Sequence, residues 1–161
     1  MKYIKEFESK KKRNFYDVFY NFLNEIKTDR KYILVNDYGS NEKHEKGLAF
    51  TVGKNVLFIL KFIRTEKFET YGITSKFWIN RITINECPFY NLPDEFRDYG
   101  YHAREIVNYL QEILMKITQD TRVTASCESF YYLEDNDVEE LKKELTKENF
   151  ELYLHMKKYN M

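Results

Sequence analysis

Residues 32–85 contain a series of β-forming segments joined by short polar connections, and this arrangement limits the fold most strongly. The segments are rich in Val, Ile, Phe and Tyr, and Gly53-Lys54-Asn55 is a good hairpin connection between two of them. The expected strands are Tyr32–Val35, Leu48–Val52, Val56–Ile63 and Ser75–Asn85, with Arg122–Cys127 as a further candidate. Because the connections are too short for helical crossovers, the sheet should be mainly antiparallel.

Helical periodicity occurs on both sides of this β-rich stretch. Apolar residues recur at helical spacing over residues 15–26, and a second such pattern predicts a long helix over Tyr99–Thr118. Two short helices are expected near residues 138–145 and 150–154. We therefore predict an α+β fold: a mainly antiparallel sheet of about four to five strands, packed by an N-terminal helix, one long central helix and short C-terminal helices.

The chain has 161 residues, a length that suits a single domain over residues 1–161. It contains no visible repeat and no linker rich in Pro, Gly or Ser. The N-terminal residues 1–13 are charged rather than apolar, and the longest apolar run, Val56–Leu60, is too short to cross a bilayer. Two isolated cysteines, Cys87 and Cys127, fit a reducing compartment. A cytoplasmic location without membrane contact is expected.

Aromatic residues make up 17% of the chain, with 14 Tyr and 13 Phe. Phe, Tyr, Ile, Asn and Lys have AT-rich codons and are abundant here, whereas Gly, Ala, Pro and Arg are scarce. This bias indicates a gene from a low-GC bacterium, or from a phage or mobile element within one. Codon supply then accounts for much of the aromatic content, so this composition by itself does not indicate a function.

Sequence motifs for metal binding or nucleotide chemistry are absent. The cysteines and histidines are Cys87, Cys127, His44, His102 and His155, and no two of them lie within ten residues of each other. Zinc sites usually contain such close pairs. The five glycines form neither of the phosphate-binding patterns GxGxxG and GxxxxGK. No metal and no cofactor are expected, and the chain is predicted not to be an enzyme.

Two catalytic arrangements stay open as alternatives. Cys87 with His102 and either Asp94 or Asp98 could supply a nucleophile, a base and an orienting group. A half-buried cysteine and a surface histidine explain the same residues. Dispersed carboxylates and a lysine could support a metal-dependent nuclease, although Glu66-Lys67, the nearest such element, lacks the usual spacing.

Charge is balanced over the whole chain and uneven along it. The 26 basic and 26 acidic residues give a net charge of zero, so the chain lacks the positive net charge that is typical of a nucleic-acid-binding protein. A local basic region could still bind single strands through stacking. Its basic residues are Lys10–Arg13, Lys54, Lys61, Arg64, Lys67, Lys76 and Arg81, and its aromatic residues are Phe58, Phe62, Phe68, Phe77 and Trp78. The alternative is a sheet with aromatic core residues on one face and solvated lysines on the other.

The region from Glu128 to Glu151 has the opposite character. It contains nine acidic residues against three lysines, and tyrosines lie close to them. Such a face could dock on a basic patch of a partner, with tyrosines as anchors. The predicted partner-binding residues are Tyr131, Tyr132, Asp135, Asp137, Glu139, Glu140, Glu144 and Tyr153.

In size, composition and mixture of helix and strand, the chain resembles the small anti-CRISPR proteins of mobile elements in low-GC Gram-positive bacteria, which inactivate Cas9-type nucleases. The resemblance implies a protein-binding inhibitor of a host nuclease. A net charge of zero argues against mimicry of the DNA duplex. It favours occupation of a protein surface, or a block on a domain movement. The alternative function is a nucleic-acid-binding accessory or regulatory protein that uses the basic N-terminal helix and the sheet lysines.

Overall fold

The fold is built on one antiparallel sheet with the strand order β1-β2-β3-β4-β6-β5. The computed structural model describes residues 15–28, 31–36, 45–69, 75–87, 92–118, 121–124 and 128–159. The strands are β1 (Tyr32–Asn36), β2 (Glu45–Val52), β3 (Asn55–Glu69), β4 (Ser75–Glu86), β5 (Thr121–Thr124) and β6 (Glu128–Glu134). Every neighbouring pair runs antiparallel. Short connections account for this between consecutive strands, whereas β4 and β6 are separated in sequence by η1, α2 and β5.

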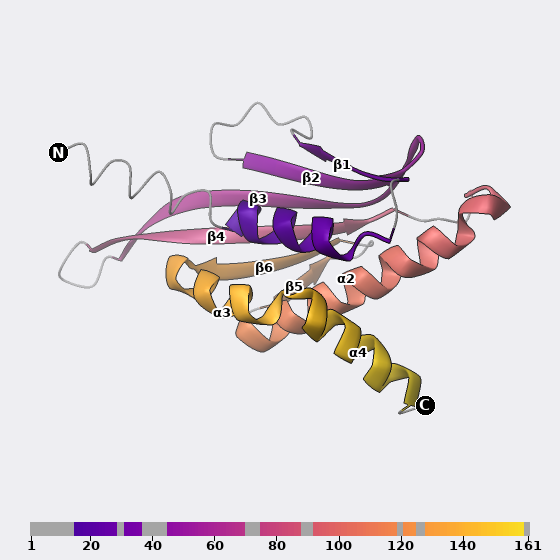
Figure 1. Cartoon of the computed structure of the whole chain (residues 1–161). Coiled ribbons are helices and arrows are strands. Elements are labelled where there is room, and N and C mark those ends of the chain that lie inside the picture. Colours follow the sequence, from indigo (N-terminus) through magenta and orange to yellow (C-terminus); the bar gives the residue numbers. More distant parts are fainter. Residues whose placement is uncertain are drawn as a thin grey trace.

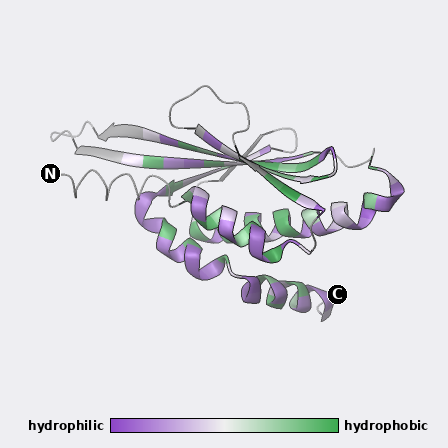
Figure 2. Cartoon of the chain, turned by 45° about the horizontal axis from the view of Figure 1, so that its top comes forward, coloured by the Kyte–Doolittle hydropathy of each residue, from purple (hydrophilic) through white to green (hydrophobic). Residues whose placement is uncertain are grey.

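The helices cover one face of this sheet (Figures 1 and 2). Residues 15–26 form the N-terminal helix. The later elements are η1 (Asp94–Phe96), α2 (Arg97–Ile117), η2 (Asp135–Asp137), α3 (Val138–Glu144) and α4 (Lys147–Tyr159). The predicted α+β architecture is confirmed, and within the described residues the sheet has six strands, one more than the upper expected number.

The additional strand is β6, which the sequence pattern did not reveal. Phe130, Tyr131, Tyr132 and Leu133 are all apolar or aromatic, so no alternation marks them as a strand. In the structure they alternate between the helix-covered face and the open face. The strand pairs on one side with β5, which precedes it in sequence, and on the other side with the distant strand β4, where Ile82 lies opposite Tyr131.

In the described part of the chain, buried apolar side chains form a cluster between the sheet and the helices. The sheet contributes alternate residues, which therefore point to the same side. These include Leu48, Phe50, Phe58, Leu60, Ile82, Ile84, Tyr131 and Leu133. The helices contribute their periodic apolar residues, including Phe19, Phe22, Leu23, Ile106, Leu110 and Leu114. Burying each such side chain stabilises the fold by about 1.5–3 kcal/mol, which holds the helices on this face.

The turn between β2 and β3 follows the hairpin prediction. Gly53 has a φ of 58°, a left-handed conformation that glycine adopts without steric cost. The turn aligns Phe50 with Phe58, and their rings stack 4.9 Å apart. In the part of the chain that the structure describes, no helix is long and apolar enough to cross a membrane.

Candidate functional site: a groove between α2 and α4

Helix α4 is attached to the fold mainly through its N-terminal half. Thr146 caps it, because the backbone N–H of Asn149 donates to Thr146 Oγ1 at 3.1 Å. Phe150 is buried, and its ring lies 5.3 Å from that of Tyr109 on α2 and 6.0 Å from that of Phe22. Beyond this anchor the helix lies on the outside of the helical layer (Figures 1 and 2).

The outer side of α4 carries a stripe of exposed apolar side chains. Leu152, Met156 and Tyr159 are 54%, 53% and 69% exposed. Their spacing of four and three residues places them on one side of the helix. Three of the six large apolar side chains that are exposed in the described residues therefore lie on this helix. Such a concentration is typical of a surface that contacts another molecule.

A groove of about 430 Å³ lies beside this stripe, between α2 and α4. Its lining is mainly apolar, with charged residues at its rim. The lining residues are Tyr109, Glu112 and Ile113 of α2, Glu144 at the end of α3, and Asn149, Leu152, Tyr153, Met156 and Lys157 of α4. Leu152 and Met156 therefore belong both to the exposed stripe and to the wall of the groove.

Polar contacts fix the floor and the rim of the groove. The hydroxyl of Tyr109 donates to the backbone carbonyl of Glu144. Burial raises the pKa of Tyr109 to about 12, and the nearby charges of Glu144 and Glu112 add to this shift. The carboxylate of Glu144 binds Lys116 Nζ at 2.9 Å. Lys157 Nζ lies over the ring of Tyr153, 4.9 Å from its centroid.

Two of the eight predicted partner-binding residues, Glu144 and Tyr153, line this groove. The side chain of Tyr131 lies in the core and is only 1% exposed. The prediction that Tyr131 contacts a partner is therefore corrected. Tyr131 is buried because β6 turns it toward the helices. Tyr132, the next residue, is half-buried on the opposite face of the sheet. The predicted tyrosines therefore do not form one cluster.

Most of the predicted acidic residues make contacts within the chain. Asp137 accepts a hydrogen bond from the backbone N–H of Glu134 at 2.8 Å, as part of a capping box. Glu139 lies 3.5 Å from Lys142, whereas Glu140 is exposed. These contacts reduce the negative field that the sequence suggested for residues 134–151.

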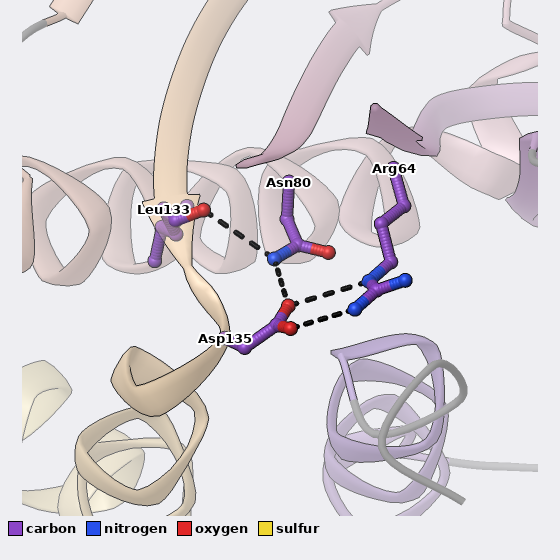
Figure 3. A network of polar contacts seen from close by, with 4 residues as sticks. All are labelled: Arg64, Asn80, Leu133 and Asp135. Carbon is purple, nitrogen blue, oxygen red and sulfur yellow. Dashed lines mark hydrogen bonds and ion pairs between the residues drawn. The ribbon is translucent and has the colours of Figure 1, made fainter. Parts of the chain in front are cut away.

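Asp135 lies in a polar network directly after the end of β6 (Figure 3). Arg64 Nη2 binds Asp135 Oδ2 at 2.7 Å, and Arg64 Nε donates to Oδ1 at 3.4 Å. Asn80 Nδ2 donates to Asp135 Oδ1 at 2.8 Å and to the carbonyl of Leu133 at 3.4 Å. The guanidinium group also lies over the ring of Trp78, 3.8 Å from its centroid. This network attaches η2 to the β3–β4 hairpin, so the role that it supports for Asp135 is structural.

The residues suggested for nucleic-acid stacking are not interleaved on one surface. Phe58 and Phe62 are buried beneath the helices, and Trp78 packs against Arg64. Lys61 points to the open face, as does Arg81, which lies over Phe130. The side chains of Phe68, Phe77, Lys67 and Lys76, and the basic segment Lys10–Arg13, lie outside the described residues.

A second pocket, of about 440 Å³, is lined by two of the residues considered for catalysis, Asp98 and His102. It is lined by Thr28, Lys31, Tyr32, Glu95, Asp98, Tyr99 and His102. His102 Nε2 lies 3.4 Å from the carbonyl of Ile26, near the end of the N-terminal helix. Cys87 follows β4 and donates its backbone N–H to Leu57; it is not among the described residues that line this pocket. Within the described ranges, no three His, Cys, Asp or Glu side chains form a group that could hold a metal ion.

Sequence reasoning overlooked Leu152 and Met156. A signal was present, because Leu152, Met156 and Tyr159 recur at helical spacing on a side of α4 that does not contain Phe150. No protein-family model, no curated protein and no solved structure matches the chain. The groove and the stripe beside it therefore carry the functional inference.

Proposed function

We propose that this chain is a non-enzymatic protein-binding domain that holds an amphipathic helix of a partner protein in the groove between α2 and α4. The observation that carries the proposal is the exposed stripe of Leu152, Met156 and Tyr159 beside a cavity of about 430 Å³. Exposed apolar side chains next to a mainly apolar groove favour burial against a partner.

The shape and lining of the groove favour a helix as the bound segment. Two helices form its walls, and Ile113, Leu152 and Met156 supply apolar contacts. An amphipathic helix binds such a groove through apolar residues at positions i, i+3 or i+4, and i+7. Glu112 is exposed on the α2 side, whereas the carboxylate of Glu144 is already paired with Lys116. The partner helix should therefore carry a basic residue that faces Glu112.

A nuclease of the Cas9 type is the partner to test first, because the chain resembles small inhibitors of such enzymes. Binding in the groove would stabilise one conformation of the nuclease and would prevent the domain movement that cleavage requires. A net charge of zero supports this mode over competition with DNA.

Selection of helical peptides tests the proposal directly. A library of amphipathic peptides about 20 residues long, which span about 30 Å as helices, is displayed on phage and selected against the wild-type protein. The variants Met156→Asp and Tyr101→Asp serve for counter-selection, since both residues are exposed and Tyr101 does not line the groove.

The expected peptides have an apolar face with an adjacent basic residue, bind the Tyr101→Asp variant normally and fail to bind Met156→Asp. Selected peptides without helical periodicity, or peptides that bind both variants equally, contradict the proposal. The same two variants, titrated into a DNA-cleavage reaction of a purified Cas9-type nuclease with its guide RNA, test the inhibitor form. There, equal inhibition by both variants rules out the groove as the inhibitory surface.

A further inference from the structure

We infer that the helix best suited to this groove is α4 of a second copy of the chain, bound antiparallel about a two-fold axis. The inference rests on the proposed function, because it uses the same groove. It adds the identity of one occupant and an oligomeric state.

The chain presents both halves of such an interface. Leu152, Met156 and Tyr159 have the spacing of four and three residues by which a helix binds a groove. Leu152 and Met156 also form one wall of the groove itself. A two-fold axis between these two residues would place Leu152 of one copy against Met156 of the other. Each helix would then fill the groove of its neighbour, as a self-complementary two-fold interface requires.

The charges along α4 set the direction of pairing. Glu148 and Glu151 lie in its first half, whereas Lys157 and Lys158 lie in its last turns, and all four are exposed. An antiparallel pair brings the acidic half of each helix beside the basic half of the other. A parallel pair would place like charges together, which is unfavourable. Lys147 is the one basic residue in the first half of α4, so the acidic excess of that half is one charge, and these four residues favour the antiparallel orientation.

The dimensions of α4 predict that the pair is weak. The helix has 13 residues and is about 20 Å long, so two copies bury less surface than a standard stable interface of about 1,600 Å². We expect a dimer that exchanges with the monomer at concentrations of about 10–100 µM. Charge pairing at the exposed rim should make it weaker as salt increases.

Sedimentation velocity of the full chain, from about 1 to 500 µM, measures this equilibrium across the expected affinity. Two charge-reversed variants, E148K/E151K and K157E/K158E, test the direction of pairing. Each alone places like charges in contact and should shift the dissociation constant upward by at least about tenfold. Mixed in equal amounts, they should form a heterodimer, because one helix then carries basic residues at all four positions and the other carries acidic residues there, with Lys147 unchanged in both. The matched control is R104E/K143E, which changes the net charge as much as K157E/K158E at exposed positions outside the groove.

A variant that carries all four reversals should dimerise again, since its helix polarity is inverted but still complementary to itself. Far-UV circular dichroism of each variant checks that α4 remains folded, and the mixture gives a gain of association that unfolding cannot imitate. A wild-type chain that is monomeric at 500 µM, or a mixture that forms no heterodimer, overturns the inference. If such a monomer still binds the selected helical peptides, only the inference fails and the proposed function stands. If the Met156→Asp variant still dimerises, the inference is also overturned, because such a dimer must form through another surface.

Discussion

Arg64 lies over the indole ring of Trp78, with its Cζ 3.8 Å from the ring centroid, while the edge of its guanidinium group binds Asp135. The arginine is on β3 and the tryptophan on β4, whereas Asp135 begins the helical C-terminal segment of the chain. An arginine can make both contacts at once because its guanidinium group is planar and offers donors along its edge. The pair of contacts therefore holds η2, and with it the start of α3, against the long β3–β4 hairpin.

Loss of the Arg64–Asp135 contact should clearly lower the stability of the folded chain. The side chain of Arg64 is 12% exposed and that of Asp135 is 28% exposed. Asp135→Ala leaves a mostly buried guanidinium group without its counter-charge, so the free energy of unfolding should fall by about 2–4 kcal/mol. Glu139→Ala, which removes an exposed pair with Lys142, is the control and should cost less than about 1 kcal/mol. Urea unfolding compares the two variants. Equal losses would show that Arg64 and Asp135 do not act as a buried pair.

Tyr131 and Tyr132 are neighbours in sequence that lie on opposite faces of β6. Tyr131 is in the core, so Tyr131→Ala should cost about 3–5 kcal/mol of stability. Tyr132 is half-buried on the open face, and Tyr132→Ala should cost about 1 kcal/mol. Thermal and urea unfolding measure both effects. A larger loss for Tyr132 would mean that the register of β6 against β4 is shifted by one residue.

Tyr109 should make the stability of the protein depend on alkaline pH. Its pKa rises from 10.0 to about 12 in the folded chain, mainly through burial, so the folded state keeps a proton that the unfolded state loses. The unfolding free energy should therefore be unaffected by this group below pH 10 and should decrease as the pH rises from 10 to about 12. The decrease is on the order of 2 kcal/mol.

Comparison with Tyr109→Phe isolates this effect, since the other groups that titrate in this range are shared. The wild-type protein should lose stability more steeply than the variant between pH 10 and about 12, measured by urea unfolding at each pH. Parallel pH profiles for the two proteins would contradict the assignment to Tyr109.

Phe150 should control the attachment of α4, and with it the groove. Its buried ring contacts Phe22 and Tyr109, so Phe150→Ala should cost about 3 kcal/mol and should release the helix. Hydrogen exchange should increase more over residues 147–159 than over β3 and β4. Leu152→Ala on the same helix is the control, because an exposed side chain contributes little to attachment. Uniform acceleration across the chain would show that α4 unfolds only with the whole domain.

The elements that local patterns define agree closely between sequence and structure. The N-terminal helix covers residues 15–26, as its periodicity predicts, and α2 covers Arg97–Ile117 against the expected Tyr99–Thr118. The hairpin turn at Gly53 was also recognisable. β3 extends to Glu69, beyond the expected end at Ile63. The residues after Ile63 are mostly charged, so their sequence does not indicate a strand, and the pairing with β4 stabilises it. Helix periodicity and turn chemistry depend on neighbouring residues, so they can be read before the fold is known.

Contacts between distant segments determined the rest. β6 lies between β5, which precedes it in sequence, and β4, which is about fifty residues earlier. The burial of Tyr131 depends on the pairing with β4, which no local pattern contains. In the same way, Leu152 and Phe150 are both apolar residues of α4, and only the packing of that helix on α2 buries one and exposes the other. The sequence by itself determined the class of fold, because hydrophobic periodicity sets helix and strand. The tertiary structure alone decided which side chains are exposed and can bind a partner, because the exposure of a side chain depends on how all the helices and strands pack together.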